Sequence, residues 1–391
     1  MKPGDLPQQL GPILCIVGAR PNFMKMAPLM RAFGEHPALP RAVLVHTGQH
    51  YDVSMSDRLF QDLQLPAPDI NLEVGSGTHA VQTAEVMRRF EPVLDRYQPS
   101  CVLVVGDVNS TLACSLVAVK RHIPVVHVEA GLRSFDRHMP EEINRVLTDQ
   151  ISDVVYTTER SAHDNLSREG IPSERMHFVG NVMIDSLLAH RKHAVSARET
   201  LQRAGVSPDI AQRYARYGVV TLHRPSNVDH AQTLRDSLVI LRKVSELIPL
   251  ICALHPRTQA NIKRFELSHL LDSDSILVLP PQGYLEMLGL MADATLVLTD
   301  SGGIQEETTA LAVPCLTMRE GTERPITVEQ GTNTIVGRDG ALILRLVQEI
   351  LTNGGKRGRV PELWDGNAAS RIADHLAAWL TSEHARAEPR P

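Results

Sequence analysis

The residues from Thr295 to Leu311 (TLVLTDSGGIQEETTAL) have the types and the spacing of a phosphate-binding turn. The apolar run Leu296-Val297-Leu298 predicts a buried parallel strand, and helical composition continues from Ile304. Between them, Ser301-Gly302-Gly303 would bring unpaired backbone N–H groups, a hydroxyl and the positive end of a helix dipole to one point. Such a point suits a phosphate. A capped helix without a ligand would show the same pattern, so this segment alone leaves both possibilities open.

Charged side chains near this turn and near the first strand-like run bear on the same question. Glu306 and Glu307 suit the dipole of the expected helix but would repel a phosphate, so we expect one of them to bind hydroxyl groups such as those of a ribose. Arg20 follows the first apolar run, with Lys25 one turn further on. Two cations around a glycine turn fit a phosphate-facing site, although solvated surface charges would look the same.

Two histidines follow strand-like runs in the second half of the chain. His223 and His255 each stand directly after such a run, and each has an arginine within two residues. This placement favours anion binding over a purely structural histidine. Neither belongs to an HExxH motif or a Cys/His cluster, so no metal site is expected.

Three acidic residues in the first half follow strand-like runs or open a helix-like segment. Asp107 and Glu129 each follow an apolar run, and Glu141 opens a helix-like segment. Glu129 comes straight after four apolar residues and is poorly placed for solvent, which suits proton transfer. Simpler roles stay open: Asp107 as a helix N-cap, and Glu129 and Glu141 in ion pairs with Arg133 and Arg145. Because the carboxyl ends of parallel strands meet at one edge, we expect all three acids on one rim.

Apolar runs of strand length alternate with helix-patterned segments along the chain, which predicts βαβ units and an α/β fold with parallel sheets. Ten strands in one sheet would be unusual, so we expect two Rossmann-like domains. The predicted domains are 1–180 and 181–365, with a terminal helix at about 366–382 after the glycine-rich loop 354–358. The expected strands are Ile13–Val17, Ala42–His46, Cys101–Val105, Val125–Val128, Asp153–Thr157, Gly218–Leu222, Leu250–Leu254, Ile276–Leu279, Leu296–Leu298 and Val313–Thr317.

Composition narrows the class of protein. The chain has 391 residues, 43% hydrophobic and 22% charged, which is ordinary for a globular enzyme. A net charge of −5 predicts no nucleic-acid partner, and the absence of long apolar runs predicts no membrane partner and a cytoplasmic location. The five cysteines lack CxxC spacing and are expected to be buried thiols.

The segment Gly75–Ala80 matches GxGxxA, but alternately polar residues precede it, so no nicotinamide cofactor is expected.

Taken together, these residues make the chain resemble the non-hydrolysing UDP-N-acetylglucosamine 2-epimerases. The resemblance runs from Gly18-Ala19-Arg20-Pro21 to about Gly337 and rests on four motifs in order. It implies a GT-B-like pair of Rossmann-fold domains with the active site in the cleft between them, a homodimer, and a C-terminal helix that returns to the first domain. It implies no cofactor and no metal. The motifs are His127-Val128-Glu129-Ala130-Gly131-Leu132-Arg133, Pro140-Glu141-Glu142-Ile143-Asn144-Arg145, Asp300-Ser301-Gly302-Gly303-Ile304-Gln305-Glu306-Glu307 and Thr322-Glu323-Arg324-Pro325.

The resemblance also assigns site residues, in one group that holds the nucleotide and another that faces the sugar. The nucleotide group comprises Arg20, His223, Ser301, Gly302 and Gly303 at the diphosphate, Glu307 at the ribose, Gln282 and Met287 beside the uracil, and Arg324, which completes the pocket. The sugar group comprises Lys25, Asp107, Glu129 and Glu141, and these three acids with His223 are the expected catalytic residues. Many relatives have Glu where this chain has Asn22 and Ser226, so the substituents of the sugar stay open.

The reaction that the resemblance implies is the interconversion of UDP-N-acetylglucosamine and UDP-N-acetylmannosamine in the supply of cell-surface polysaccharide precursors. The C2 proton is not next to a carbonyl, so we expect UDP to leave first or together with that proton, giving 2-acetamidoglucal, followed by re-addition. The alternatives are a 2-epimerase of a modified UDP-N-acetylamino sugar, a GT-B glycosyltransferase, and a UDP-sugar-binding protein without turnover. Incubation with UDP-N-acetylglucosamine alone distinguishes them, because only an epimerase forms the manno isomer without an acceptor.

Overall fold

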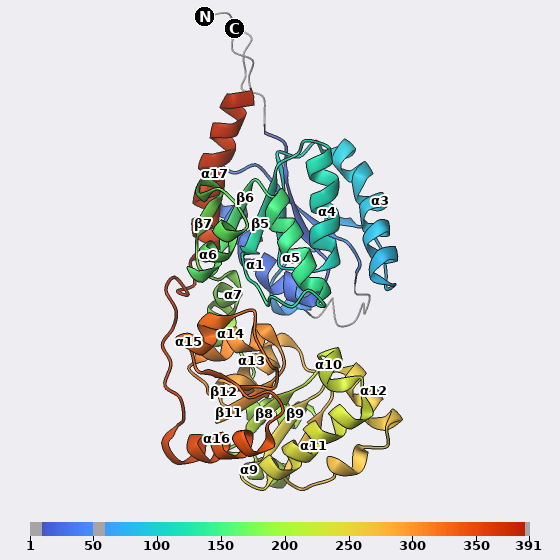
Figure 1. The fold of residues 1–391 in the computed structure, drawn as a ribbon, viewed down its shortest axis with the longest axis vertical. Helices are drawn as coiled ribbons and strands as arrows, with labels where there is room; N and C mark the ends of the chain where they lie inside the picture. The colour runs from blue at the N-terminus through green and yellow to red at the C-terminus, as the bar shows by residue number, and fades with distance from the viewer. Residues whose placement is uncertain (1–9, 50–58, 388–391) are drawn as a thin grey trace, which may run out of the picture. The chain divides into compact units, whose positions relative to one another are not determined.

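The computed structural model describes residues 10–49 and 59–387 of the chain, which forms two compact units. Unit 1 extends to Ser186 and resumes at Glu362, whereas unit 2 comprises Leu187–Pro361. Each unit contains a parallel β-sheet together with helices (Figure 1). The predicted fold class, an α/β, GT-B-like chain with two Rossmann-like sheets, is confirmed.

Unit 1 contains a seven-stranded parallel sheet in the order β3-β2-β1-β4-β5-β6-β7. All residues of β1 and β4 are buried, as expected for a sheet that helices cover on both faces. The strands are β1 Ile13–Val17, β2 Ala42–His46, β3 Ile70–Asn71, β4 Cys101–Val105, β5 Val125–Ala130, β6 Val154–Thr157 and β7 Met176–Phe178. The helices are α1 Arg20–Glu35, α3 His79–Tyr97, α4 Asn109–Lys120, α5 Pro140–Ile151, α6 Ser161–Arg168 and α17 Ala368–Ala387, while α7 Val182–His190 leads into unit 2.

Unit 2 contains a six-stranded parallel sheet in the order β10-β9-β8-β11-β12-β13. Its core is formed by buried aliphatic residues of these strands and of the two helices α11 and α16. The strands are β8 Gly218–Thr221, β9 Leu250–Ala253, β10 Ile276–Leu279, β11 Leu296–Thr299, β12 Cys315–Thr317 and β13 Asn333–Ile335. The helices are α8 Ala197–Arg203, α9 Pro208–Arg213, α10 Pro225–Val228, α11 Ala231–Ser245, α12 Pro256–Arg264, α13 Tyr284–Ala292, α14 Gly302–Leu311, α15 Pro325–Glu329 and α16 Gly340–Asn353.

Both sheets reverse their strand order at one point. In unit 1 the chain steps from β1 outward to β2 and β3 and then returns to the other side of β1 with β4. Unit 2 repeats this step with β8, β9, β10 and then β11. Ligands of open α/β sheets bind at the carboxyl ends of the strands beside such a reversal. The turns after β1 and β4, and those after β8 and β11, are therefore where binding residues are expected.

Three short strands are absent from the sequence-based expectation. The strands β3, β7 and β13 have only two or three residues, and each lies at an edge of its sheet. Runs this short carry too little hydrophobic pattern to be recognised, and an edge strand needs less of it. The strand at Val313–Thr317 also proves shorter, because regular pairing begins only at Cys315.

The last helix, α17, packs on unit 1, beside elements from the start of the chain (Figure 1). The Nε1 of Trp364 donates to a backbone carbonyl after β6 at 3.0 Å, and the hydroxyl of Tyr156 lies 2.8 Å from Nδ1 of His375. Two backbone N–H groups at the start of α17 donate to Asp185, whose pKa burial raises to about 6. Burial and the neighbouring His375 lower the pKa of His177 to about 4.

All five cysteines are buried free thiols, as predicted. Burial raises the pKa of Cys101 to about 12, so this thiol is unreactive at neutral pH. Within residues 10–49 and 59–387, no helix has both the length and the apolar composition that a bilayer crossing requires.

Candidate active site

Glu129 occupies a β-bulge at the end of β5. The strand pairs with β6 in register at Val128 and again at Ala130, so Glu129 is an extra residue between them. Its φ is +69°, in the left-handed region, which costs a residue with a side chain roughly 1–2 kcal/mol. The bulge directs the carboxylate to α1, where Oε2 lies 2.6 Å from Nζ of Lys25. Both side chains are buried, so the pair is shielded from water.

The position of Lys25 depends on the turns after β1 and β4. The side-chain oxygen of Asn22 accepts the first two backbone N–H groups after β1, at 3.2 and 3.0 Å, and its nitrogen donates to the last carbonyl of β4 at 3.0 Å. A neutral amide can do both, whereas a carboxylate could only accept. Gly106, which follows β4, has φ +66°, and a Cβ there would lie 3.1 Å from Nζ of Lys25. Glycine therefore leaves room for the lysine at this turn.

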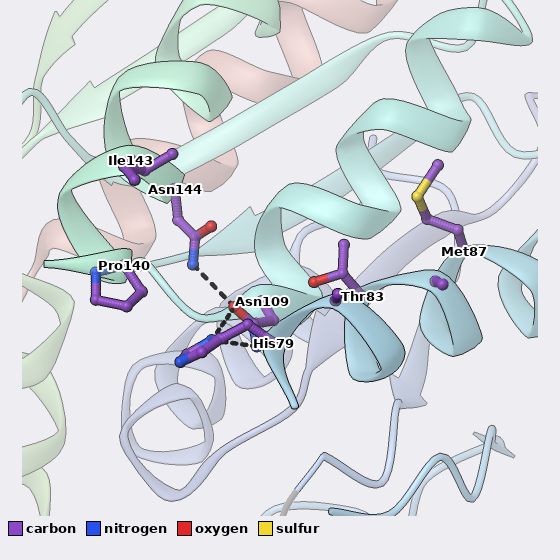
Figure 2. Close-up of a pocket in the computed structure, with 9 residues that line it drawn as sticks. His79, Thr83, Met87, Asn109, Pro140, Ile143 and Asn144 are labelled. Atoms are coloured by element: carbon purple, nitrogen blue, oxygen red, sulfur yellow. Dashed lines mark hydrogen bonds between the residues drawn. The ribbon is translucent and has the colours of Figure 1, made fainter. Parts of the chain in front are cut away.

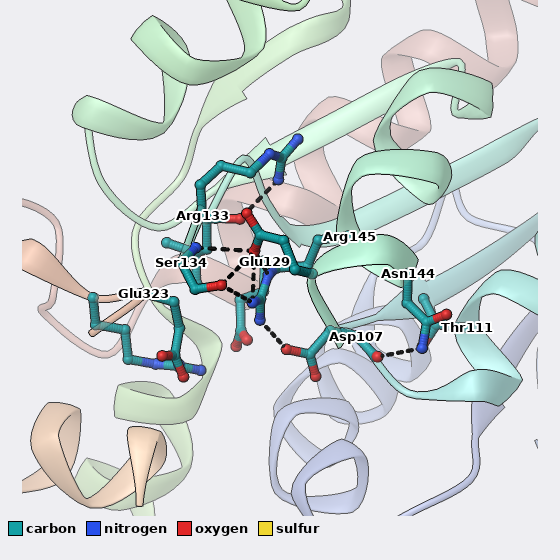
Figure 3. A network of polar contacts seen from close by, with 12 residues as sticks. Asp107, Thr111, Glu129, Arg133, Ser134, Asn144, Arg145 and Glu323 are labelled. Atoms are coloured by element: carbon teal, nitrogen blue, oxygen red, sulfur yellow. Dashed lines mark hydrogen bonds and ion pairs between the residues drawn. The ribbon is translucent and has the colours of Figure 1, made fainter. Parts of the chain in front are cut away.

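Asp107 is held by an arginine of α5. Arg145 forms an ion pair with the Asp107 carboxylate and donates to Oε2 of Glu142 from Nε and Nη2, at 3.1 and 2.8 Å (Figure 3). Burial alone would raise the pKa of Glu142, but hydrogen bonds from the Ser134 backbone and from Arg145 outweigh burial and lower it. The predicted capping role of Asp107 is wrong, because Val108 is the N-cap of α4 and no side chain caps it.

A second buried carboxylate of α5, that of Asp149, joins the loops around Glu129. Its Oδ1 lies 2.6 Å from Nδ1 of His127, and its Oδ2 accepts from the backbone N–H of Gly131 at 3.0 Å and from Nη2 of Arg133 at 2.7 Å. The other ring nitrogen of His127 lies 2.9 Å from the Gly106 carbonyl oxygen. Burial alone would raise the pKa of Asp149, but the charges of His127 and Arg133 outweigh burial and lower it.

The remaining predicted residues of unit 1 stand at helix starts. Arg20 is the first residue of α1 and is half-buried. Glu141 lies in the first turn of α5, half-buried, with no hydrogen bond or ion pair to any residue that the structure describes. The alternative pairing of Glu141 with Arg145 is therefore wrong, as is that of Glu129 with Arg133, which pairs with other carboxylates.

In unit 2, Asp300 connects the turns after β8 and β11. Its buried carboxylate accepts from the backbone N–H groups of His223 and Arg224, at 3.0 and 2.9 Å, and from the Asn227 amide at 3.0 Å. The Nδ1 of His223 lies 3.1 Å from Oδ1 of Asp300, while the side chain of this histidine remains 41% exposed. Burial alone would raise the pKa of Asp300, but the hydrogen bond and charge of His223 outweigh it and lower the pKa. Asp300 therefore orients the predicted catalytic histidine.

The first turn of α14 packs against an arginine. Ser301 is the N-cap of α14 in an extended conformation, and no side chain caps the helix start. A Cβ on Gly302 would lie 2.5 Å from Nη1 of Arg324, so glycine is needed for the guanidinium to approach the helix. Gly303 is half-buried in the same turn. The helix N-terminus and Arg324 thus form one positive group, as an anion site requires.

Arg324 belongs to a cluster of three arginines around Glu323. Oxygens of Glu323 lie 2.6 Å from Arg324, 2.7 Å from Arg319 and 3.4 Å from Arg224, and Glu306 lies 3.0 Å from Nε of Arg324. Burial alone would raise the pKa of Glu323, but the charges of Arg324 and Arg319 outweigh it and hold the pKa well below its usual range. Three guanidinium groups face two carboxylates, so the cluster carries an excess of positive charge.

The residues predicted to border the nucleoside lie on α13 and α14. Glu307 is buried on α14 beside Tyr284, whose pKa is raised well above its usual value by burial and by this carboxylate. Met287 is half-buried in α13, and the side chain of Gln282 donates to the Pro280 carbonyl just before this helix, at 2.6 Å. The two helices pack against each other, so these residues gather on one side of the turn after β11.

The second histidine that the sequence singles out has a local role. Nδ1 of His255 accepts from the backbone N–H of Arg257 and caps α12, at 3.2 Å. Arg257 itself pairs with Asp229, the C-cap of α10. Of the two predicted anion-binding histidines, His223 is therefore the one at the sheet reversal. Among the described residues, no cluster of three or more His, Cys, Asp and Glu side chains could hold a metal ion.

Comparison with known proteins assigns the chain to a family. A family model described as UDP-N-acetylglucosamine 2-epimerase matches residues 34–377. The chain belongs to the UDP-N-acetylglucosamine 2-epimerase family. It is therefore an isomerase, and the resemblance inferred from its motifs is confirmed.

Individual epimerases resemble the chain over almost its whole length. The UDP-N-acetylglucosamine 2-epimerase of Methanocaldococcus jannaschii is 41% identical over 363 residues, 91% of this chain and 96% of that protein. The UDP-2,3-diacetamido-2,3-dideoxy-D-glucuronate 2-epimerase of Pseudomonas aeruginosa is 40% identical over 370 residues, 93% and 99% of the two chains. A crystal structure of the M. jannaschii enzyme in complex with UDP-GlcNAc and UDP superposes with a TM-score of 0.82, covering 94% of this chain and 99% of that one.

The epimerase also has a hollow between α3 and α5 that no motif indicated. It has a volume of about 420 Å³ and is lined by apolar residues of both helices with four polar side chains, those of His79, Thr83, Asn109 and Asn144 (Figure 2). His79 lies 3.1 Å from Nδ2 of Asn109, and Asn144 donates to Oδ1 of Asn109 at 3.3 Å and to the backbone carbonyl of Asp107 at 2.9 Å. The hollow therefore adjoins the turn that carries Asp107.

Sequence reasoning missed the residues of α5 that hold the epimerase rim in place. Glu142, Arg145 and Asp149 recur at helical spacing and are all buried. A stripe of charged residues on the buried face of a helix is unusual, since such residues are rarely buried unless they are paired. That stripe is the signal that could have indicated them.

Proposed function

We propose that the enzyme interconverts UDP-N-acetylglucosamine and UDP-N-acetylmannosamine by elimination and re-addition of UDP. The observation that carries this proposal is the pair Glu129 and Lys25, a carboxylate directed by a bulge to the carboxyl edge of a parallel sheet, with Asp107 following the neighbouring strand. Two carboxylates beside one sugar carbon are what an epimerisation needs, because a proton leaves one face of C2 and another returns to the opposite face.

In the proposed elimination, the C1–O bond breaks and UDP leaves with the bonding electrons. A carboxylate of the group Asp107, Glu129 and Glu141 takes the C2 proton, and the electron pair of the C2–H bond forms the C1–C2 double bond of 2-acetamidoglucal. In the second half an acid of the same group protonates C2 from the other face while an oxygen of UDP forms a new bond to C1. Lys25 keeps its partner Glu129 in place during both steps.

The departure of UDP places negative charge on its phosphate, and unit 2 supplies donors for it. We propose that His223, Ser301, Gly302, Gly303 and Arg324 bind the diphosphate, with Arg20 contributing from α1. The uncapped start of α14 and the surplus guanidinium charge beside it support this role. We assign Glu307 to the ribose, and Gln282 and Met287 to the edge of the uracil.

Proton NMR of UDP-N-acetylglucosamine with the pure protein in D₂O tests the proposal. We expect the manno isomer to appear without any acceptor or nicotinamide, with solvent deuterium at C2 of the product. Product that keeps only its original hydrogen at C2 would contradict the mechanism. Free N-acetylmannosamine would point instead to a hydrolysing reaction.

A modified sugar is the second candidate substrate. It is supported by the Pseudomonas relative, whose name specifies a diacetamido glucuronate and which is about as similar as the Methanocaldococcus enzyme. The neutral residues Asn22 and Ser226 would remove negative charge near an anionic sugar. Comparing kcat/KM for the two UDP-sugars decides between them.

We further propose that the enzyme acts as a homodimer in the cytoplasm and supplies precursors of cell-surface polysaccharide. The exposed apolar side chains of Val81, Ile143 and Leu147, on α3 and α5, support a second copy of the chain at this face. The double variant I143E/L147E would be monomeric in light scattering if this is the interface, and dimeric if it is not. Deleting the gene should remove N-acetylmannosamine derivatives from the surface polymer, and an unchanged polymer would contradict the proposed role.

A further inference from the structure

Asp149 contacts the chain on both sides of the bulge that carries Glu129, through a side chain before it and a backbone N–H after it. One of its oxygens binds His127, two residues before Glu129, and the other binds the N–H of Gly131, two residues after it. Glu129 has a left-handed φ, and such a conformation persists only where the surroundings over-determine it. The single carboxylate of Asp149 supplies contacts to both flanks of this strained residue.

The same carboxylate reaches the turn that carries Asp107. The far ring nitrogen of His127 lies 2.9 Å from the carbonyl oxygen of Gly106, which directly precedes Asp107. A carbonyl oxygen only accepts hydrogen bonds, so in this contact the ring nitrogen of His127 is the donor. The imidazole therefore links Asp149 to the turn after β4, as a rigid spacer between two acceptors.

The cluster is fully buried from bulk solvent, which makes its geometry exacting. The side chains of His127 and Asp149 are both 0% exposed, and Arg133 supplies a further cation at 2.7 Å. Hydrogen bonds between charged groups are short and directional, and at a buried site bulk solvent does not readily replace a lost partner. A change at Asp149 must therefore be taken up by movement of the groups that it holds.

We propose that Asp149 is the positioning residue of the epimerisation: through Gly131 and His127 it sets where the Glu129 and Asp107 carboxylates stand relative to each other. This inference rests on the proposed function, in which these two acids handle the C2 proton. Asp149 touches no reacting atom and acts only through the loops. A displacement of about 1 Å at such distance from the chemistry can cost roughly a hundredfold in rate.

The test is Asp149→Asn, which keeps the shape of the side chain. One carboxylate oxygen becomes an NH₂ group, which would face the donors that Asp149 now binds, on His127 or on Gly131 and Arg133. We expect kcat per UDP-binding site, counted by calorimetry, to fall about a hundredfold while KM stays within about threefold. With C2-deuterated substrate, the isotope effect should rise, because proton transfer becomes the slow step. Asp185→Asn is the matched control: it alters a buried carboxylate of unit 1 that also accepts two backbone N–H groups, but away from the rim.

His127→Gln provides a second variant that leaves the Asp149 contacts with Gly131 and Arg133 in place. We expect a loss of about tenfold, and a double variant no slower than Asp149→Asn alone, because both act through one link. If Asp149→Asn does not fold, His127→Gln decides by the same criteria. A crystal structure of the variant should show that Glu129 has moved from its contact with Lys25.

Two results would overturn the inference: turnover per binding site within about threefold of wild type, or a loss of turnover with Glu129 and Gly106 in unchanged positions. Failure of the proposed function would look different. In that case the wild-type enzyme itself would incorporate no deuterium at C2, while the displacement of Glu129 in the variant structure would still be measurable.

Discussion

Around the sheet reversal, unit 1 carries Lys25 on α1, Asp107 after β4 and Glu129 at the end of β5. The equivalent region of unit 2 carries His223, Asp300 and the start of α14. Both units have the same order of strands around the reversal, so the difference lies in the side chains and not in the scaffold. In unit 1 the acids are directed toward the edge of the sheet and cations hold them there. In unit 2 the acids Asp300 and Glu323 are buried, and they orient His223 and three arginines through hydrogen bonds and ion pairs.

The contrast shows how one topology can serve two chemical tasks. A carboxylate that handles a proton must be fixed in space, and the Lys25–Glu129 and Arg145–Asp107 pairs do this. A diphosphate site needs surplus positive charge with preorganised donors, and the arginines around Glu323 provide it. If this division is correct, variants of unit 1 should lower kcat, while variants of unit 2 should weaken the binding of UDP.

The largest effect is expected from Glu129→Gln. The amide fills the same space but cannot take the C2 proton, so we expect kcat to fall about a thousandfold and deuterium incorporation at C2 to stop. The Kd for UDP, measured by calorimetry, should stay unchanged, since Glu129 is not among the residues proposed to bind the nucleotide. Glu85→Gln, a surface change on α3, is the control. An active Glu129→Gln enzyme would mean that the base lies elsewhere.

The counterpart in unit 2 is Arg324→Lys. Lysine keeps the charge but loses the planar fork that contacts both Glu323 and Glu306, so we expect the Kd for UDP to rise about ten- to a hundredfold. At saturating substrate kcat should change less. Arg257→Lys, at an exposed ion pair of the same unit, is the control. A Kd equal to that of wild type would remove Arg324 from the nucleotide site.

A methyl group added to either turn gives a more direct comparison. The Cβ of Gly106→Ala would press on Lys25, and that of Gly302→Ala on Arg324. We expect about a tenfold loss in each, in kcat for the first and in the Kd for UDP for the second, as measured by steady-state kinetics and calorimetry. The comparison fails if both changes alter the same constant. Gly34→Ala, where a Cβ would meet nothing, is the control for an added methyl.

The smallest effect concerns a carboxylate away from both rims. The pKa of Asp185 is about 6 in the folded chain and 3.8 in the unfolded reference, so the folded state binds this proton more tightly. Its stabilising contribution is complete below about pH 4 and is lost as the pH rises through about 6. From pH 7.5 to pH 5, wild type should gain about 1 kcal/mol in unfolding free energy relative to Asp185→Asn.

Urea denaturation of both proteins at the two pH values measures this difference. Other titrating groups, including His177, are present in both proteins and cancel. A difference of the opposite sign would show that the backbone hydrogen bonds to Asp185 outweigh its burial. In that case Asp185 would resemble Glu142, whose partners lower its pKa despite burial.

Much of the fold follows from the sequence because central parallel strands are continuous apolar runs. The runs at β1, β2, β4 and β10 have the bounds predicted for them. The edge strands β3, β7 and β13 escape prediction because two or three residues show no pattern, whereas the edge strand β10 has four. The site residues that the sequence places after the central strands stay predictions, although Asp107 and His223 do follow β4 and β8 in the structure.

The partners of those residues could not be predicted. Glu129 lies 104 positions from Lys25, and the sequence offered the nearer Arg133 as its partner. Sequence reasoning favours ion pairs between residues that are close in the chain, because such pairs can be recognised from spacing alone. A bulge that redirects one side chain cannot be recognised in this way. The role of Asp149 depends on three contacts from different elements, so it becomes visible only in the folded chain.

The packing of α17 on unit 1 has a consequence for the order in which the two units can fold during synthesis. Unit 1 is built from both ends of the chain, so a ribosome has released all of unit 2 before the segment that packs beside Tyr156 emerges. Unit 2 can therefore complete its core first, whereas unit 1 cannot complete its packing until α17 has been synthesised. A released chain truncated after Pro361 should resist protease in its later portion and remain sensitive in its earlier one.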